Sequence, residues 1–379
     1  MKGRVIVKYA QHPYVRGIVG KYAIEIVPCY RLPSAEKIKS AVDRTPFHVK
    51  YLKEKFSLKL SDEVRLLKKF LDANGMYGAD VKTQGFSGYL CDLLILNYKS
   101  FINVLNNVVK WEPGEIIDIE RHWSKKDHKK LRKKFKGEVL IIIDPVDKNR
   151  NAAAAVSPEN FFKFKKLAKQ FLKKPSEEFF VKKKEKKLSP REFKRIVKQR
   201  KTKLLLLVFK PPSVVPDILW PQLRKTSHRL RDILHEYEFS VHRFDCWTDE
   251  KNLAVILFEL EIWELPNIDE RIGPLIFDLK NSEKFIKKYK GNSITGPYIL
   301  ENRWRFEVKR KWKSAKDKLK DSLSDPEKVL IAKGIPNHIA RSLTKGFKIL
   351  EEKDILNLLK KNEELGRFLH RYFYKEELA

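Results

Sequence analysis

The sequence KLLLLVF at residues 203–209 is a continuous apolar run between Lys203 and Lys210, which is typical of a buried β-strand. A helical pattern over residues 221–237 follows it, and two further strand patterns cover residues 239–247 and 254–263. This strand–helix–strand–strand order predicts a small antiparallel sheet backed by a helix, and therefore an α+β domain.

The beginning of the sequence predicts two strands, but no neighbouring strands that would form a stable sheet with them. Residues 4–9 and 22–27 alternate between apolar and polar side chains, and a connection containing Pro and Gly, residues 13–20, separates them. A lone pair of strands is marginally stable in water. We therefore expect the chain to begin partway through a larger sheet.

Helical patterns dominate residues 35–107. Ser61 is the expected N-cap of one helix, whose apolar face comprises Val64, Leu67, Phe70 and Leu71 and whose end is Asn74-Gly75. A second helix is expected to open at residues 85–88 and to run to about residue 104. A strand is expected at residues 138–143.

The rest of the chain is strongly basic. Residues 175–200 are interpreted as a linker or an exposed basic hairpin. From about Glu283 the pattern mixes a strand that contains Trp304 and Phe306 with basic helices. The fold class expected for the whole chain is multidomain α+β, with several small units rather than one large sheet.

Composition limits the class of protein. The 379 residues include 81 Lys and Arg against 49 Asp and Glu, a formal net charge of +32, with 42% hydrophobic residues. No apolar run is long enough to span a bilayer and no signal peptide is evident, so we expect a cytoplasmic protein without a membrane partner. Cys29, Cys91 and Cys246 are too dispersed for a disulfide framework or a paired zinc site.

So large a positive charge indicates polyanionic partners, because cationic side chains that neutralise phosphates release condensed counterions. RNA, DNA and an anionic membrane surface would all satisfy it. A proteome that is rich in lysine throughout would produce the same charge without any ligand. Nucleic acid is the partner class we favour.

Common catalytic motifs are absent from the sequence. It contains no Walker loop, no G-x-G-x-x-G, no H-E-x-x-H, no G-x-S-x-G, no D-x-D pair and no Gly-Ser dipeptide. Taken alone, Glu25 is a solvent-facing acid on a strand and His48 is a satisfied surface histidine. Lys68 and Tyr77 bracket a helix end, where they could converge on phosphate oxygens or belong to an ordinary amphipathic helix and its loop.

Several long segments, taken together, resemble the archaeal CCA-adding enzymes, which are class I tRNA nucleotidyltransferases. They occur in the order of that family, and a weaker match covers residues 220–230. The matching segments are residues 8–15 (KYAQHPYV), 26–30 (IVPCY), 38–48 (IKSAVDRTPFH), 62–71 (DEVRLLKKFL), 74–80 (NGMYGAD), 85–94 (GFSGYLCDLL) and 144–157 (DPVDKNRNAAAAVS).

The resemblance implies a head, neck, body and tail, in which the neck completes a nucleotide pocket and the body and tail grip the upper half of tRNA. Residues 1–33 would be the last strands of a nucleotidyltransferase head, and residues 34–172 the helical neck. Residues 173–282 would form a small α+β body, and residues 283–379 a mixed basic tail that binds tRNA.

The same resemblance assigns site residues. Glu25 falls where the family has its third metal-binding acid, usually Asp, so it would be catalytic and would bind Mg²⁺. His48, Lys68 and Tyr77 fall on positions that contact the incoming triphosphate. Arg150 falls on the arginine that helps to read the incoming base.

The sequence departs from the family in two respects. The family's Gly-Ser motif, which holds the triphosphate, and its D-x-D pair, which binds Mg²⁺, precede KYAQHPYV, and this sequence starts just before that segment. Either the enzyme is divided between two genes or the chain is a truncated version of it; an initial Met in a loop favours division. Glu25 also has one more methylene than Asp, which shifts a ligand oxygen by about 1 Å.

Two functions are therefore expected as alternatives. The first is the large subunit of a divided CCA-adding enzyme, inactive alone, which uses CTP and ATP once a small head subunit supplies the Gly-Ser and D-x-D motifs. The chemistry would be a two-metal attack of the tRNA 3′-hydroxyl on the α-phosphate with release of pyrophosphate. The second is a non-catalytic remnant that only binds tRNA. Homodimerisation through the tail is compatible with both.

Overall fold

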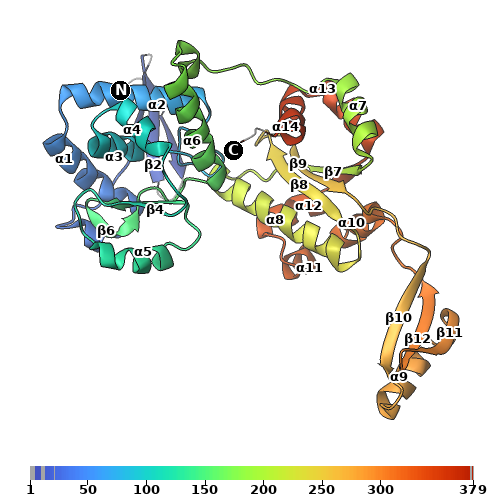
Figure 1. The fold of residues 1–379 in the computed structure, drawn as a ribbon. Helices are drawn as coiled ribbons and strands as arrows, with labels where there is room; N and C mark the ends of the chain where they lie inside the picture. The colour runs from blue at the N-terminus through green and yellow to red at the C-terminus, as the bar shows by residue number, and fades with distance from the viewer. Residues whose placement is uncertain (1–4, 10–12, 21, 376–377, 379) are drawn as a thin grey trace. The chain divides into compact units, whose positions relative to one another are not determined.

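The computed structural model describes residues 5–9, 13–20, 22–375 and 378 (Figure 1). The chain divides into two compact units, each described separately below. Unit 1 comprises Met1–Glu185, Val215–Trp220 and Lys375–Ala379, and unit 2 comprises Lys186–Val214 and Pro221–Tyr374. The mixed α/β, multidomain fold class expected from the sequence is confirmed.

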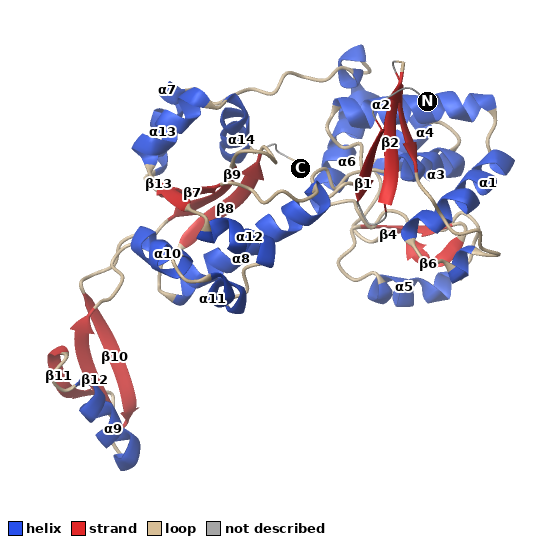
Figure 2. Cartoon of the chain, turned by 180° about the vertical axis from the view of Figure 1, so that it is seen from behind, coloured by secondary structure: helices blue, strands red, loops and turns tan. Residues whose placement is uncertain are grey.

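Unit 1 begins with a three-stranded antiparallel meander, β1 (Val5–Tyr9), β2 (Pro13–Val19) and β3 (Tyr22–Ile26), in the order β1-β2-β3 (Figure 2). The expected strands at both ends are present, although Arg4 lies outside the described residues. The prediction that residues 13–20 form a connection was wrong, since β2 pairs with both neighbours along its length. Within the described residues, β1 and β3 are the edges of this sheet.

Helices make up most of the remainder of unit 1. The α-helices that follow the meander are α1 (Thr45–Lys55), α2 (Leu58–Ala73), α3 (Gly88–Tyr98), α4 (Phe101–Val108), α5 (His128–Lys134) and α6 (Pro158–Lys173). Short 3-10 turns lie at Ala35–Lys37 (η1), Ala41–Arg44 (η2), Lys125–Asp127 (η3) and Glu177–Phe180 (η4).

Two helix boundaries differ from the prediction. Ser57, not Ser61, caps α2, because its hydroxyl accepts the backbone N–H of Leu60. The second predicted helix is divided in two, because Lys99 adopts a left-handed conformation with φ 71° and Ser100 caps α4. Either serine satisfies the sequence rule for a cap, so only the packing of the preceding turn decides between them.

The core of unit 1 is rich in aromatic side chains and includes buried residues of α2, α3, α4 and α6. Phe70 on α2 lies 5.5 Å from Phe101 on α4, 6.2 Å from Phe164 and 5.8 Å from Phe171 on α6, measured between ring centroids. The apolar face predicted for α2 is buried as expected. Helix α3 is apolar around most of its circumference, as a fully buried helix should be, and this fixes the position of its N-terminus.

A second small sheet lies in the same unit, in the order β4-β5-β6: β4 (Glu115–Ile117), β5 (Leu140–Asp144) and β6 (Asp147–Asn151). β5 is the strand expected at residues 138–143, two residues later at its start. It is buried throughout, pairs in parallel with β4 and antiparallel with β6, and ends at the tight turn Asp144-Pro145-Val146-Asp147.

The strand–helix–strand–strand prediction is confirmed in unit 2. β7 (Lys203–Phe209), β8 (Val241–Thr248) and β9 (Ala254–Leu260) pair antiparallel in the order β13-β7-β9-β8, with β13 (Phe347–Leu350) contributed by the C-terminal region. Helix α8 (Pro216–Glu236) begins five residues earlier than expected and contains Pro221. β13 has no equivalent among the predicted elements.

The expected linker at residues 175–200 is confirmed in part: residues 182–189 have no regular secondary structure and contain the boundary between the units, whereas η4 precedes them and a helix follows. Ser189 forms a capping box with Glu192 and starts α7 (Pro190–Arg200), which buries Phe193 and Ile196. The basic residues of α7 lie on the exposed face of a short amphipathic helix, whereas the lysines at residues 182–187 precede that helix. The helix was missed because only two of its side chains are apolar and buried.

A buried carboxylate connects α7 and the last helix, α14 (Glu363–Phe373), to the sheet β13-β7-β9-β8. Glu259 on β9 is fully buried and accepts hydrogen bonds from Arg200, Thr202 and the hydroxyl of Tyr372. Burial raises the pKa of Glu259, but these hydrogen bonds outweigh it and hold the pKa below its ordinary value. The three segments therefore share one ionised acid.

Unit 2 also contains a second antiparallel sheet, in the order β10-β12-β11, covered by α9 (Leu279–Tyr289). Residue 283, where the tail was expected to begin, lies within α9. Trp304 and Phe306 lie on β12, where a strand was expected. The remaining elements of this unit are β10 (Ile268–Leu275), β11 (Ser293–Leu300), β12 (Arg303–Lys309), α10 (Ala315–Leu323), α11 (Glu327–Ala332), α12 (Asn337–Thr344) and α13 (Glu352–Lys361).

Within the described part of the chain, no helix is both long enough and apolar enough to cross a membrane.

Candidate nucleotide site

The centre of the site is Asp144, the last residue of β5, whose side chain is fully buried. Its Oδ2 lies 2.9 Å from Nε2 of His48 and accepts a 2.7 Å hydrogen bond from Nη1 of Arg150. Its Oδ1 accepts a 3.0 Å hydrogen bond from the hydroxyl of Tyr89 and a 3.1 Å bond from the backbone N–H of Val146. Four donors thus surround one carboxylate.

His48 lies on the first turn of α1, which places its ring against α3. The imidazole stacks on Tyr89 with ring centroids 3.8 Å apart and planes 18° from parallel. Only 15% of the His48 side chain is exposed. Taken alone, the sequence placed a satisfied histidine at the surface; the residue is satisfied but largely buried, because Asp144 and Tyr89 enclose it.

The ionisation states in this cluster follow from the environment. Burial raises the pKa of Asp144. Opposing effects that are larger together lower it: the hydrogen bond from His48, the charges of His48 and Arg150, and the N–H of Val146. The pKa of Asp144 therefore lies below its ordinary value. Burial and the neighbouring Asp144 charge raise the pKa of Tyr89, which keeps its phenol protonated. Because Asp144 is ionised at neutral pH, Nε2 of His48 must be the donor in their hydrogen bond.

A second cluster lies at the N-terminus of α3. Lys68 on α2 donates a 2.9 Å hydrogen bond from Nζ to Oδ1 of Asp92 on α3. A Cβ placed on Gly88, the first residue of α3, would lie 3.1 Å from the Tyr77 hydroxyl and 3.7 Å from Nζ of Lys68. Lys68 and Tyr77 therefore converge over a residue that has no side chain, beside the free N–H groups of a helix end.

The loop that carries Tyr77 needs its glycines. A bridge pairs Tyr77 with Phe86, and Gly78 has φ +128°, a conformation that side-chain-bearing residues rarely adopt. A Cβ on Gly85 would lie 2.0 Å from the carbonyl oxygen of Met76, so no larger residue fits there. The glycines let the loop fold back tightly against α3.

The two clusters are adjacent, because Gly88 and Tyr89 are consecutive residues of α3. Beside them is a pocket of about 560 Å³, a volume within the range of small-molecule sites. Arg150 and Asp147 of β6 line it, with Arg44, whose Nε donates to Asp147 at 3.2 Å. The other lining residues are Ala79, Ser87, Phe135, Glu138, Asn149, Asn151, Ala152, Ala154 and Ala155.

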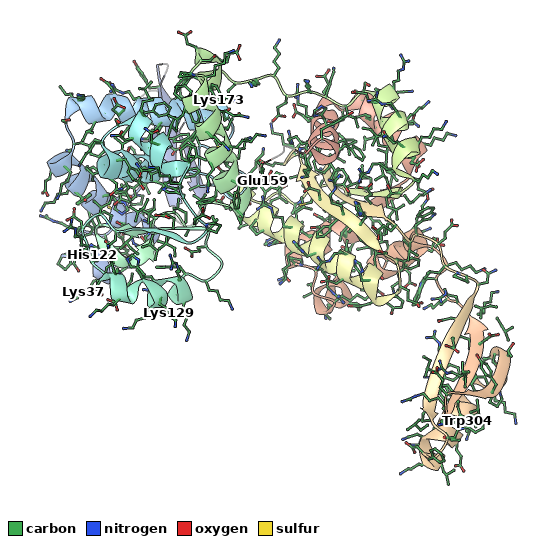
Figure 3. The ribbon with its side chains drawn as sticks, viewed as in Figure 1. Lys37, His122, Lys129, Glu159, Lys173 and Trp304 are labelled. Atoms are coloured by element: carbon green, nitrogen blue, oxygen red, sulfur yellow. The ribbon has the colours of Figure 1, made fainter. Side chains whose placement is uncertain are left out.

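The turn that carries Asp144 is also held from its outer side. Nε2 of His122, labelled in Figure 3, lies 2.9 Å from the carbonyl oxygen of Pro145. The indole N–H of Trp123 donates to the carbonyl of Lys148 at 2.9 Å. These contacts fix the backbone from which Asp144 and Arg150 project.

Of the residues assigned from the sequence, the structure brings His48 and Arg150 together on Asp144, and Lys68 and Tyr77 together over Gly88. Glu25 lies on β3 in the meander of the same unit, exposed and in register opposite Arg16. The chain after β3 is anchored by a 2.9 Å hydrogen bond from the N–H of Tyr30 to Asp43.

The acidic residues in the described part of the chain are not gathered into a metal site. Among the residues that the structure describes, no three His, Cys, Asp or Glu side chains are grouped as metal ligands. Mg²⁺ in nucleotide enzymes is usually bound by one or two carboxylates together with substrate phosphates. Glu25 is one carboxylate in the described part of the chain.

Sequence reasoning missed the acceptors of the site. Asp144 and Asp147 were noted within a matching segment but were given no role, and Asp92 and Tyr89 were not considered. The signal was the pair Asp144 and Asp147, three residues apart in a turn after a fully apolar strand. Acids at the end of a buried strand are unusual unless they have cationic partners.

Comparisons with known proteins relate both units of the chain to nucleotidyltransferases. The family model described as tRNA nucleotidyltransferase, second domain, matches residues 62–181, and that described as CCA-adding enzyme, C-terminal domain, matches residues 200–352. The first of these matches contains Lys68, Tyr77, Asp144 and Arg150. Both units of the chain are thus related to one class of protein.

Similar proteins include three CCA-adding enzymes. That of Methanosarcina acetivorans is 37% identical over 366 residues, covering 96% of this chain and 76% of the relative. That of Methanoregula boonei is 38% identical, over 97% of this chain and 75% of the relative, and that of Methanocaldococcus jannaschii is 44% identical, over 76% and 63%. The chain belongs to the CCA-adding enzyme family.

Proposed function

We propose that this chain is the large subunit of a divided tRNA nucleotidyltransferase, which adds C, C and A to the 3′ end of tRNA from CTP and ATP. The observation that carries the proposal is the convergence of Lys68 and Tyr77 over Gly88, next to His48 and Arg150 on Asp144. A protein that only bound tRNA would not need these side chains gathered beside a helix N-terminus and a pocket.

The geometry supports separate roles for these residues. Lys68, Tyr77 and the N-terminus of α3 present positive charge and donors to the triphosphate. His48 adds a further contact, and Arg150, which lines the pocket, presents its remaining N–H groups to the base edge. In the reaction, the tRNA 3′-oxygen bonds to the α-phosphorus, the α–β phosphoanhydride breaks, and pyrophosphate leaves. Glu25 would accept the proton of the 3′-hydroxyl.

The sheet of β1–β3 supports a separate head polypeptide. Tyr22, Ile24 and Ile26 alternate along β3 and therefore share one face, and 65%, 39% and 55% of their surfaces are exposed. Val15 and Gly17 are the register partners of Ile26 and Ile24 on that face. Sheet faces of this composition are normally covered. The proposed head subunit would cover this face and supply the Gly-Ser loop and the D-x-D pair, which these 379 residues lack.

The same proposal accounts for the remaining partners. Glu25 and the two head aspartates would hold Mg²⁺, which neutralises phosphate charge when bound. The net charge of +32 suits tRNA, whose phosphates the body and tail would contact. A homodimer through the tail would leave this arrangement unchanged.

A non-catalytic tRNA-binding remnant is the second candidate. Glu25, in the place where the family usually has Asp, favours it. The two candidates differ in nucleotide binding, because a remnant has no reason to retain affinity for CTP or ATP.

Replacement of Lys68 by methionine tests the nucleotide pocket. The variant keeps most of the side-chain length and loses the ammonium, and Asp92, whose pKa burial already raises, can take up a proton in response. We expect the affinity for CTP to fall roughly 10- to 100-fold, the effect of one charged hydrogen bond. The affinity for tRNA should change less than about twofold, since counterion release is shared among many cations. Calorimetric titration measures both.

The matched control is Lys69→Met, which removes the same charge from an exposed position on the same helix. It should leave CTP binding at the wild-type level. Wild-type CTP affinity in Lys68→Met would show that the cluster over Gly88 is not a triphosphate site. No measurable CTP binding by this chain mixed with a folded polypeptide that carries the Gly-Ser and D-x-D motifs would favour the remnant.

A further inference from the structure

We propose that Asp144 is a positioning residue that holds His48 and Arg150 in one fixed arrangement, so that nucleotide-binding groups from separate segments act as a unit. The inference rests on the proposed function, because it takes His48 and Arg150 as nucleotide contacts. Asp144 itself does not need to touch the nucleotide.

The hydrogen bonds of Asp144 are divided between its two oxygens. Oδ2 takes the two cationic or ring donors, His48 and Arg150, and Oδ1 takes Tyr89 and the N–H of Val146. An ionised carboxylate has about four acceptor positions, so this one is fully used. Its side chain is completely buried, and a buried charge persists only when it is paired in this way.

The donors come from three parts of the fold: α1, α3 and the hairpin of β5 and β6. His48 is on α1, Tyr89 on α3, Val146 in the turn after β5, and Arg150 on β6. His48 and Asp144 are 96 residues apart in the sequence. Asp144 links α1 to β6 at the pocket, beside a second link between Arg44 and Asp147.

The consequence for His48 is a fixed ring. The Nε2 proton points at Asp144 and Tyr89 stacks on one face, which together determine both the tautomer and the plane of the imidazole. Nδ1 is then the ring nitrogen that remains for a ligand. Without Asp144, the ring could rotate and present either nitrogen.

The consequence for Arg150 is a fixed guanidinium. One of its five N–H groups is used by Asp144, and 35% of its side chain remains exposed at the pocket. A guanidinium that is hydrogen-bonded through one N–H group presents its other donors in a defined plane. Discrimination between bases depends on such a plane, because C and A differ from U and G in their donor and acceptor pattern.

Asp144→Asn is the direct test, made in the complete enzyme with its head polypeptide. Asparagine keeps the size and one acceptor oxygen, which can still serve Tyr89 and Val146, but places an N–H₂ donor against His48 and Arg150. We expect KM for CTP and ATP to rise roughly 10- to 100-fold with a smaller change in kcat. Incorporation of UTP relative to CTP should also increase.

Glu63→Gln is the matched control for a purely structural effect. Glu63 accepts a 2.7 Å hydrogen bond from the backbone N–H of Phe101, in the same unit but away from the pocket. Its loss should lower stability without changing KM or the preference for CTP over UTP. Equal changes in KM for both variants would overturn the inference.

A multiple-mutant comparison separates positioning from general damage. If Asp144 acts through His48 and Arg150, adding Asp144→Asn to a His48→Ala, Arg150→Ala background should cause no further loss. A further loss as large as in the wild-type background would overturn the inference.

Nuclear magnetic resonance of the His48 ring distinguishes failure of the inference from failure of the proposed function. In the unmodified chain alone, with no activity needed, His48 should be protonated at Nε2, with that proton protected from exchange. A ring protonated mainly at Nδ1, or a rapidly exchanging Nε2 proton, would overturn the inference even if nucleotide addition is observed. A protected Nε2 proton without nucleotide addition would support the positioning of His48 by Asp144 and would place the failure in the proposed function.

Discussion

Glu25→Gln is expected to abolish nucleotide addition by the complete enzyme while leaving tRNA binding intact. Glutamine has the shape of glutamate without its charge, so it can neither accept the 3′-hydroxyl proton nor contribute a carboxylate to Mg²⁺. Groups of this kind supply several kcal/mol of transition-state stabilisation, which corresponds to about a 1,000-fold fall in kcat. The measurement is single-turnover incorporation of labelled CTP at saturating tRNA.

Two further variants show whether the effect belongs to this carboxylate. Glu54→Gln removes an exposed acid from α1 and should have no effect on addition. Glu25→Asp moves the carboxylate by about 1 Å toward β3 and should retain most of the activity, because the charge remains. If the activity of Glu25→Gln stays within about tenfold of the wild type, Glu25 does not act at the reacting phosphate.

Ile24→Asp is expected to prevent association with the head polypeptide. Ile24 lies on the exposed apolar face of β3, and an interface there would bury the new carboxylate without a partner. A penalty of several kcal/mol weakens the complex by at least about 100-fold. Analytical ultracentrifugation of the mixture measures the loss, and nucleotide addition should fall in proportion to the complex that remains.

The control for this variant is Val181→Asp. Val181 is 62% exposed in the same unit, just after η4, and is not part of the meander. It introduces the same charge without touching the proposed interface, so association should be unchanged. Because Ile24 is already 39% exposed, its replacement should not unfold the isolated chain. If Ile24→Asp associates with the head polypeptide as the wild type does, the head does not bind this face of β3.

The local pattern of apolar residues was sufficient to predict those strands and helices in which the buried positions repeat with the period of the strand or helix. β7 and the apolar face of α2 were predicted correctly, because each is a regular pattern bounded by polar residues. β2 was not, since its Pro13 and Gly17 are residues that usually mark a turn. The break at Lys99 was missed although Ser100 is a possible N-cap, because apolar residues continue on both sides.

The site was predictable only in part for a related reason. His48, Lys68, Tyr77 and Arg150 were assigned through resemblance, and the structure groups them in two pairs. Asp144, which His48 and Arg150 share, was not linked to His48 from spacing, because a hydrogen bond across 96 residues leaves no periodic signal. Contacts of this kind depend on how α1, α3 and β5 pack, which a single sequence does not encode in any local pattern.

The most direct test of the proposal that the active site is divided is incorporation of labelled CTP and ATP into tRNA that lacks its CCA end. It compares this chain alone, a polypeptide carrying the Gly-Ser and D-x-D motifs alone, and the two mixed, each with Mg²⁺. We predict addition only in the mixture, since each part lacks carboxylates that the other supplies. Addition by this chain alone would contradict the account, as would a folded, associated mixture that binds tRNA and CTP without adding a nucleotide.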